Sequence, residues 1–358
     1  MNILESSSPC VYIDKKQGEK LRKFLVGYDL LDKSKLIKVK EDFIYFPIKK
    51  NIDNIEKSQI LDNFNSALFS TSKFKLREKS DTLMDIFSKH FDWNELKFIP
   101  RSLDIVGSIA ILEIPSELRM KENLLAKLLL EHNKSLKSVF SKIGKVDGEF
   151  RTRELKFLAG EHNTVTIHKE NGCRFELDVK KVYFSPRLST EHARIADMIN
   201  SDEIVLDMFA GIGPFSVLIA KRKGAKIYAL DKNPDAIFYL KRNIILNKIK
   251  NLIVPLLGDA QKLILTSFKE KFNRIIMNLP EKSYDYLSTA CYTLKPEGGI
   301  IHFYTFRTES ETYKEIEERL SDEIQKHGKK INDLKFRKVK STAPHEYQIC
   351  VDIHIVSN

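Results

Sequence analysis

The stretch IVLDMFAGIGPF (204–215) decides the fold, because an apolar run is followed at once by a glycine turn. Glycines at 211 and 213 lack the Cβ that would clash where a chain turns sharply or where its backbone approaches a ligand. The residues that follow, PFSVLIAKRKG (214–224), predict a helix. A strand, a glycine turn and a helix in this order predict a ligand-binding edge of an open α/β sheet.

Acidic residues follow the next two predicted strands. Asp231 ends KIYALD (226–231), where a carboxylate can accept hydrogen bonds from both ribose hydroxyls, and Asp259 follows LIVPLLG, where it could bind an adenine amino group. The turn lacks the third glycine of a dinucleotide site, so the spacing resembles the cofactor site of class I methyltransferases. The alternative is a tight turn whose acidic neighbours only cap strands. The residues expected to bind the cofactor are Asp207, Phe209, Gly211, Gly213, Asp231, Asp259 and Asn278.

Helices and strands alternate from residue 186 onward, which predicts an open, mostly parallel sheet with helices on both faces. Two strand-like runs around a turn containing proline close the chain (335–357). Such a terminal antiparallel hairpin is typical of Rossmann-like methyltransferases that use S-adenosylmethionine. Asn278-Leu279-Pro280 follows the strand-like run RIIM. In enzymes that methylate nitrogen, an Asn-x-Pro at this point faces the methyl acceptor, whereas the alternative is a simple strand-ending turn.

The first part of the chain has a different organisation. The runs 36–40 and 43–48 predict a hairpin, and the polar stretch 62–80 predicts a linker. Mixed helices and strands follow from about 81, including an apolar helix at 122–133, and Asn171-Gly172 predicts a hairpin turn. We therefore expect a small N-terminal tRNA-recognition domain (1–66), an α+β RNA-binding domain (67–165) and a class I methyltransferase domain (166–358).

Composition narrows the class of protein. A chain of 358 residues has a net charge of +11, which concentrates polyanions such as nucleic acid, although a lysine-rich proteome would give the same excess. Four scattered cysteines exclude a disulfide framework and a zinc ribbon, and they suit a reducing cytoplasm. No apolar run reaches the ~18 residues that span a bilayer, and no secretory signal is recognised. We expect a cytoplasmic protein that does not enter membranes.

Two further segments carry a family resemblance: GEFRTREL (148–155) with LAGE (158–161), and YFSPRLSTE (183–191). Together with DMFAGIGPF, MNLP and GGIIHFYTF, they closely resemble the archaeal and eukaryotic tRNA methyltransferases that form N1-methylguanosine at position 37. The resemblance covers roughly 145–310 and is weaker over the first 140 residues. The same superfamily contains the wybutosine-pathway enzyme that transfers an aminocarboxypropyl group from the same cofactor.

The resemblance implies roles for particular residues. Guanine N1 must lose its proton before or during attack on the methyl group, and the family uses for this the glutamate found here as Glu191. The family's arginine that stabilises negative charge on O6 is Arg151 here. A helix-start carboxylate and a solvent-facing charge are the alternatives for these two residues. Asn278 and Pro280 would hold the flipped-out guanine.

Further contacts to RNA follow from the same resemblance. Tyr183 and Arg187 would shape the pocket and contact the anticodon-loop backbone, and His192 replaces an arginine found in many relatives. Histidine contacts phosphate by charge only when it is protonated. The N-terminal unit, with lysines in 33–40, would contact the outer corner of tRNA, or would simply be a solvated charged face.

Three hypotheses remain open at this stage. We expect a monomeric enzyme that methylates N1 of guanosine 37 in tRNA with S-adenosylmethionine, and we predict no metal-ligating residues. A second hypothesis is a wyosine-pathway enzyme, acting by C7 methylation of the tricyclic precursor or by aminocarboxypropyl transfer. A third is a tRNA-binding protein without turnover. Glu191 favours N1 methylation, because it can serve as the general base that N1 methylation requires. Attack by the side-chain carbon of the tricyclic nucleobase requires no general base.

Overall fold

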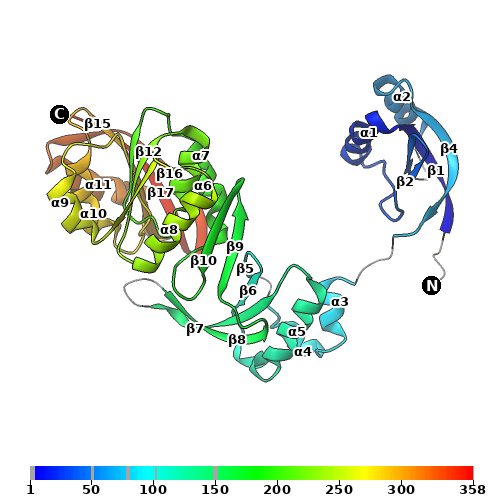
Figure 1. Cartoon of the computed structure of the whole chain (residues 1–358), viewed down its shortest axis with the longest axis horizontal. Helices are drawn as coiled ribbons and strands as arrows, with labels where there is room; N and C mark the ends of the chain where they lie inside the picture. Colours follow the sequence, from blue (N-terminus) through cyan, green and yellow to red (C-terminus); the bar gives the residue numbers. More distant parts are fainter. Residues whose placement is uncertain (1–4, 50–51, 78–80, 101–102, 148–151, 358) are drawn as a thin grey trace. The chain divides into compact units, whose positions relative to one another are not determined.

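The computed structural model describes residues 5–49, 52–77, 81–100, 103–147 and 152–357, and for 145–147 and 152–153 the backbone alone. The chain forms two compact units, Met1–Asp85 and Ile86–Asn358 (Figure 1). Among the described residues, no helix is both long and apolar enough to cross a bilayer.

The N-terminal unit is a four-stranded sheet with strand order β2-β3-β1-β4 and two helices. Its elements are β1 (Glu5–Asp14), α1 (Lys15–Gly27), β2 (Lys38–Lys40), β3 (Phe43–Pro47), α2 (Asn54–Asn63) and β4 (Leu68–Lys75). Val11, Leu21 and Phe46 are among the apolar residues that form its core. The β2–β3 pairing confirms the hairpin predicted at 36–48.

The predicted linker at 62–80 is wrong where β4 forms. This strand pairs with β1 in antiparallel register from Glu5↔Lys75 to Tyr12↔Leu68, so it belongs to the N-terminal sheet. The predicted domain boundary at 66 therefore lies too early. Only Phe74 of β4 is buried, because the strand lies at an edge of the sheet. An edge strand with one buried side chain has almost no apolar periodicity to recognise.

An α+β part follows, and its first helix spans the division between the two units. Its elements are α3 (Leu83–Ser88), α4 (Trp93–Leu96), β5 (Asp104–Val106), β6 (Ile109–Leu112), η1 (Ser116–Lys121), α5 (Glu122–His132), β7 (Ser138–Asp147) and β8 (Thr152–Gly160). The sheet has strand order β5-β6-β7-β8. Helix α5 buries Leu125, Leu128 and Leu129 on one face, which confirms the helix predicted at 122–133.

A hairpin leads from this part into the large sheet. Strands β9 (Val165–Glu170) and β10 (Cys173–Asp178) pair in antiparallel fashion. The turn residues Asn171 and Gly172 have φ of 49° and 76°. Positive φ at both central positions is what a type I′ turn requires, so the predicted hairpin is confirmed.

The rest of the unit is a seven-stranded sheet with order β13-β12-β11-β14-β15-β17-β16. Its strands are β11 (Ile204–Asp207), β12 (Lys226–Asp231), β13 (Ile253–Leu257), β14 (Arg274–Met277), β15 (Gly298–Thr308), β16 (Lys329–Ala343) and β17 (Glu346–Ser357). Neighbours from β13 to β15 are parallel, whereas β17 is antiparallel to β15 and β16. The predicted Rossmann-like sheet with a terminal antiparallel hairpin is confirmed.

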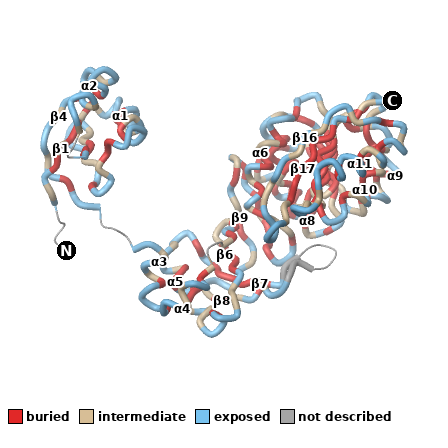
Figure 2. Tube along the Cα trace, turned by 180° about the vertical axis from the view of Figure 1, so that it is seen from behind, coloured by how far each residue is buried: buried red, intermediate tan, exposed pale blue. Residues whose placement is uncertain are grey.

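Helices cover both faces of this sheet, and buried residues concentrate on its strands (Figure 2). Successive strand residues alternate between two cores: Ile276 packs with α6 (Ser189–Asp197), α7 (Pro214–Lys223) and α8 (Pro234–Leu246). Ile275 and Met277 pack with α9 (Ala260–Ser267), α10 (Ser283–Thr293) and α11 (Tyr313–Gln325). A strand period of two on a sheet covered on both faces explains this alternation.

The strand order reverses beside β11, which lies between β12 and β14. In open α/β sheets, ligands bind outside the carboxyl ends of the strands at such a reversal. Asp207, Asp231 and Asn278 end or follow these three strands. The topology therefore brings the residues predicted to bind the cofactor to one edge.

Candidate active site

The glycine loop after β11 adopts a conformation that two glycines permit. Gly211 and Gly213 have φ of 56° and 88°, values that residues with a Cβ rarely adopt. A Cβ at Gly213 would lie 2.4 Å from Cδ1 of Leu240, so this glycine allows α7 to pack closely. A Cβ at Gly211 would meet only the carbonyl oxygen of Tyr183, at 3.9 Å. The backbone at Gly211 is therefore open to a ligand.

Asp231 joins this loop to the end of β12. The Gly211 N–H donates to its Oδ2 at 2.7 Å, and the Asn233 N–H donates to its Oδ1 at 2.8 Å. Burial raises the pKa of the Asp231 carboxyl. Each carboxylate oxygen can accept more than one hydrogen bond, so acceptor capacity remains for a ligand.

Asp207 supports the loop from within the protein. It is fully buried, Oδ2 accepts a 2.7 Å hydrogen bond from the Ser216 hydroxyl, and Oδ1 has no partner among the described residues. Burial raises the pKa of Asp207 to about 7. Asp207 and Gly213 were also predicted to bind the cofactor, but neither residue lines the pocket beside the loop. The structure therefore does not support direct contact between these two residues and the cofactor.

The glycine-loop pocket, a cavity of about 200 Å³, lies at the ends of β11, β12, β13 and β14. Lys232 Nζ lies 3.6 Å from Asp259 Oδ2 at its margin. Phe209 packs edge-on against Tyr286, with ring centroids 5.0 Å apart. The pocket includes five of the predicted cofactor residues: Phe209, Gly211, Asp231, Asp259 and Asn278. The sequence analysis missed other lining residues, among them Lys232, Asn233, Lys282 and Tyr286.

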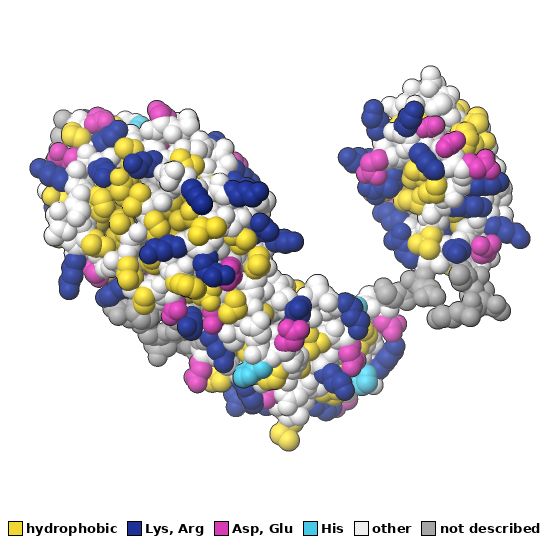
Figure 3. Space-filling view, in the orientation of Figure 1, with side chains coloured by type: hydrophobic (Ala, Val, Ile, Leu, Met, Phe, Trp, Pro, Cys, Tyr) yellow, Lys and Arg dark blue, Asp and Glu magenta, His cyan; other side chains and the backbone are white. Residues whose placement is uncertain are grey.

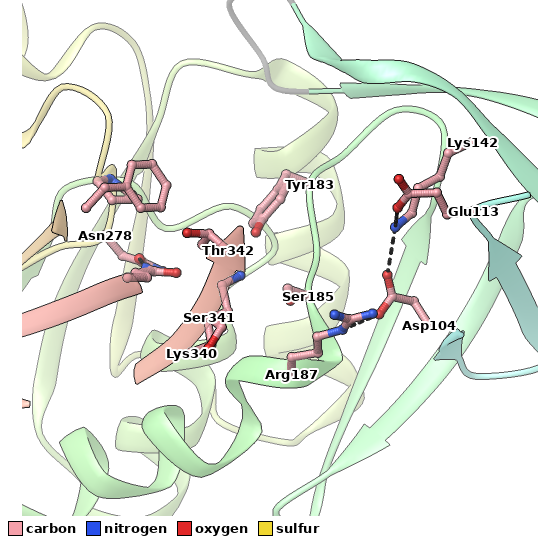
Figure 4. A pocket seen from close by; sticks show the side chains of 13 residues that line it. Asp104, Glu113, Lys142, Tyr183, Ser185, Arg187, Asn278, Lys340, Ser341 and Thr342 are labelled. Carbon is pink, nitrogen blue, oxygen red and sulfur yellow. Dashed lines mark hydrogen bonds and ion pairs between the residues drawn. The ribbon is translucent and has the colours of Figure 1, made fainter. Parts of the chain in front are cut away.

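A second cavity of about 280 Å³, here called the polar pocket, is shown in Figure 4. Tyr183 and Asn278 line both cavities. The Gln348 amide donates to Asn278 Oδ1 at 3.0 Å, which orients the Asn278 side chain. The residues that line the polar pocket are Asp104, Glu113, Lys142, Tyr183, Ser185, Arg187, Asn278, Pro280, Phe306, Lys340, Ser341, Thr342 and Gln348.

Charged groups gather at one side of the polar pocket. Arg187 Nε donates to Asp104 Oδ1 at 2.7 Å, and Lys142 Nζ lies 3.4 Å from Asp104 Oδ2 (Figure 4). Although burial opposes ionisation, Lys142 and Arg187 lower the pKa of Asp104. Asp104 and Lys142 come from the α+β part, which a local sequence motif could not connect with this site.

Glu191, the predicted general base, lies in the first turn of α6 and lines neither cavity. Its side chain is 3% exposed. The Arg194 guanidinium donates to both carboxylate oxygens, at 2.9 and 2.7 Å, and the Tyr304 hydroxyl donates to Oε1 at 2.8 Å. The structure thus holds Glu191 in a buried ion pair.

The prediction that His192 contacts RNA is contradicted by its burial. The residue is 1% exposed, its Nδ1 lies 2.7 Å from Glu170 Oε1, and its ring packs edge-on against Phe215. Position 192 follows Glu191 on α6 and faces the β9–β10 hairpin instead of the polar pocket. Arg151, predicted to bind guanine O6, lies outside the described residues.

The fold and the pocket at the sheet reversal define a class I methyltransferase. Comparisons with known proteins identify its family. The chain belongs to the TRM5/TYW2 methyltransferase family. The model of the TRM5/TYW2 methyltransferase domain matches residues 166–332, the TYW2 N-terminal domain matches 83–164, and the tRNA methyltransferase 5 N-terminal domain matches 10–56. S-adenosylmethionine is the cofactor of this family, and Phe209, Gly211 and Asp231 line a cavity suited to it.

Two curated relatives illustrate two of the family's reactions. The tRNA (guanine(37)-N(1))-methyltransferase Trm5b of Pyrococcus abyssi is 38% identical over 345 residues, 96% of this chain and 98% of the relative. The tRNA 4-demethylwyosine(37)-methyltransferase Taw21 of Saccharolobus solfataricus is 38% identical over 256 residues, 71% of this chain and 93% of the relative.

Solved structures agree with this assignment. The crystal structure of Pyrococcus abyssi Trm5b covers 98% of this chain and 99% of its own, with a TM-score of 0.71 and 37% identity. The complex of aTrm5 with tRNALeu covers 96% and 99%, with a TM-score of 0.66 and 37% identity. Methanocaldococcus jannaschii TYW2 in complex with AdoMet covers 72% and 100%, with a TM-score of 0.57 and 30% identity.

Replacing Asp231 tests its place in the cofactor pocket. Asp231→Asn should weaken S-adenosylmethionine binding by roughly 1.5–3 kcal/mol, the worth of a hydrogen bond to a charged group. Titration calorimetry measures this loss. Asp235→Asn, at a half-exposed carboxylate outside the pocket, is the control and should bind normally. Unchanged affinity of Asp231→Asn would remove this carboxylate from the cofactor site.

The raised pKa of Asp207 predicts a pH dependence of stability. With a folded pKa of about 7, the folded state keeps a proton that the unfolded state has already lost above pH ~4. The free energy of unfolding should therefore fall as pH rises from about 4 to 7, by about 4 kcal/mol from this group, and level off above. Denaturant titrations across this range should show a weaker fall for Asp207→Asn. Equal slopes for both proteins would contradict the assignment.

Proposed function

We propose that this chain transfers the methyl group of S-adenosylmethionine to N1 of guanosine 37 in tRNA. The observation that carries the proposal is the shared wall of two adjacent cavities, made by Tyr183 and Asn278. A cofactor in one cavity and a base in the other would meet at these residues. Similarity to Trm5b over 96% of the chain supports the choice of substrate.

The polar pocket suits a base taken out of its stack. Tyr183 offers an aromatic face and Pro280 an apolar one, and both line the cavity. Asn278 is oriented by Gln348, so its amide can bind a base edge in one fixed direction. Enzymes that act on a base extrude it into such a pocket and hold its edge by hydrogen bonds.

We assign the proton transfer to Glu191 and the stabilisation of O6 to Arg151. Guanine N1 carries a proton that must leave as the methyl group arrives, and a carboxylate can take it. Negative charge then develops on O6, where a guanidinium donor lowers its energy. Glu191 lies in the first turn of α6, four residues after Arg187, and its partner Tyr304 is two residues from Phe306 in the pocket lining. Catalytic hydrogen bonds often form only in the substrate complex, so Glu191 remains our candidate.

We assign phosphate contacts to cations at the margin of the polar pocket. Arg187, Lys142 and Lys340 line it, and the first two are held by Asp104. Lys and Arg side chains also lie along both edges of the N-terminal unit in Figure 3. We propose that this unit contacts the outer corner of tRNA and that the α+β part binds the anticodon arm. We also propose that the chain acts as a monomer in the cytoplasm.

A wyosine-pathway reaction is the second candidate. Taw21 and a tRNA(Phe) (4-demethylwyosine(37)-C(7)) aminocarboxypropyltransferase resemble 71% and 58% of this chain. Trm5b resembles 96%, and the tRNA methyltransferase 5 N-terminal model matches 10–56. The extent of the resemblance therefore favours N1 methylation of guanosine.

Product analysis separates the candidates. The purified chain is incubated with labelled S-adenosylmethionine and unmodified tRNA, and the nucleosides are analysed by mass. We expect N1-methylguanosine from a guanosine-37 transcript and none from an adenosine-37 control. An aminocarboxypropyl adduct, product only from tRNA that carries the tricyclic base, or no product would each contradict the proposal.

Glu191→Gln tests the general base. The amide keeps size and hydrogen bonding but loses basicity, so single-turnover methyl transfer should fall by on the order of 10²–10⁴. Affinity for tRNA and cofactor should change little, because the lost interaction belongs to the transition state. Transfer at the wild-type rate with saturating substrates would leave Glu191 a helix-start carboxylate only.

A further inference from the structure

A buried chain of charged groups extends from Glu191 into the sheet. Behind the Glu191–Arg194 pair, Arg194 Nη1 donates to Asp352 Oδ2 at 2.5 Å and Nη2 lies 3.2 Å from Oδ1. Asp352 lies on β17, in a different part of the sequence from α6. One guanidinium therefore holds two carboxylates, one on each side.

His302 anchors the far carboxylate as a neutral ring. Its Nε2 lies 3.0 Å from Arg274 Nη1, and its Nδ1 lies 2.6 Å from Asp352 Oδ1. Because a guanidinium only donates, Nε2 must accept and Nδ1 must carry the hydrogen that goes to Asp352. Burial lowers the pKa of His302, in keeping with a neutral ring.

The chain of groups leads directly toward the polar pocket. Strands β15 and β17 place three pairs directly opposite one another: His302↔Asp352, Tyr304↔Cys350 and Phe306↔Gln348. Residues two apart on a strand point to the same face, so the three pairs form one stripe. Phe306 and Gln348 line the pocket, and Tyr304 bonds Glu191. Asp352 thus belongs to the second strand pair behind the Phe306–Gln348 pair that lines the pocket.

The cluster is not arranged for a metal ion. His302, Cys350 and Asp352 offer ligand atoms within 4.8 Å of one another. However, Arg274 bonds the His302 nitrogen, and Arg194 bonds both Cys350 Sγ and Asp352. Two guanidinium cations on these atoms oppose a third cation there.

We propose that Asp352 is a positioning residue for methyl transfer, which shares the charge of Arg194 so that Glu191 is held in place without losing its basicity. The proposal rests on the proposed function, in which Glu191 takes the proton from guanine N1. An arginine paired with Glu191 alone would stabilise the anionic carboxylate more strongly and make it a poorer base. Shared between two carboxylates, Arg194 still finds a full partner in Asp352 when Glu191 becomes neutral.

The other groups around Glu191 have a weaker electrostatic effect on its carboxylate than Arg194 has. Burial raises the pKa of both Tyr304 and Cys350, so they stay neutral. Arg337 Nε lies 3.5 Å from Glu191 Oε2, but its side chain is 49% exposed and solvent weakens its field. The titratable and charged groups that face Glu191 from the surrounding elements are Arg194, Tyr304, Arg337 and Cys350, and Asp352 lies beyond Arg194.

The test is the pH dependence of single-turnover methyl transfer by the full chain, with saturating tRNA transcript and S-adenosylmethionine. In Asp352→Asn, Arg194 pairs with Glu191 alone. We expect the plateau rate to fall by about tenfold or more, a part of the roughly 10²–10⁴-fold that a placed base supplies. The acid limb of the profile should move to lower pH, since the anion of Glu191 is then more strongly stabilised. Affinities for tRNA and cofactor should stay unchanged.

Glu203→Gln is the matched control. Glu203 pairs with Arg274 at the other end of the network, at 2.9 Å, and touches neither Glu191 nor Arg194 in the described contacts. Its variant should keep the wild-type plateau and acid limb. If Asp352→Asn keeps the wild-type rate, or loses rate with an unmoved acid limb, the proposal is overturned.

Two further variants keep the result interpretable. Should Asp352→Asn not fold, Arg194→Lys removes the two-sided fork while keeping charge. We expect a comparable loss of plateau rate with unchanged affinities, whereas Arg222→Lys, at an exposed pair with Asp197, should be neutral. A wild-type rate for Arg194→Lys overturns the proposal. Glu191→Gln is measured alongside: a wild-type rate there refutes the assigned base itself, whereas a loss there with a normal Asp352→Asn refutes only the role of Asp352.

Discussion

The hydrogen bond from the Gly211 N–H to the Asp231 carboxylate is the interaction on which the site depends. It is 2.7 Å long and joins the loop after β11 to the end of β12. It forms because parallel neighbouring strands end at the same edge and because a glycine can take the positive φ that turns its N–H toward the acid. Asp207, buried below, supports the same loop through Ser216. The cofactor pocket is thus defined by backbone as much as by side chains.

The proposed methyl transfer has a second requirement, a wall common to the cavity of the methyl donor and the cavity of the acceptor base. Asn278 follows β14 on the other side of β11, and Gln348 from the terminal hairpin holds its amide. Tyr183 reaches the same point from the segment before α6. Direct transfer needs reacting groups held in contact and aligned. Because the two cavities share residues, a methyl donor in one and an acceptor base in the other could react directly, without a carrier that moves between them.

Much of the fold could be predicted from local patterns. Alternating strands and helices and the IVLDMFAGIGPF turn identify the parallel sheet, and Asn171-Gly172 identifies a hairpin. The edge strand β4 escaped prediction because only Phe74 is buried there. In the site, five predicted cofactor residues line one cavity, since strand ends in a parallel sheet converge by topology.

Other site features depend on tertiary contacts that no local pattern contains. His192 is one residue from Glu191, yet a helix turns adjacent side chains about 100° apart, and here His192 faces Glu170. Asp104 and Lys142 reach the polar pocket from another sheet, and Asp352 approaches Arg194 from β17. Sequence motifs can name a reactive residue, whereas its partners are assembled by the fold.

Photocrosslinking would test most directly whether the acceptor base occupies the polar pocket. A tRNA carrying 6-thioguanosine at position 37 is irradiated with the full chain and S-adenosylhomocysteine, and the attached peptide is identified by mass spectrometry. The account predicts attachment at Tyr183 or in the segment 278–280, and loss of the crosslink when unlabelled tRNA competes. Attachment confined to peptides that do not line the polar pocket would contradict it.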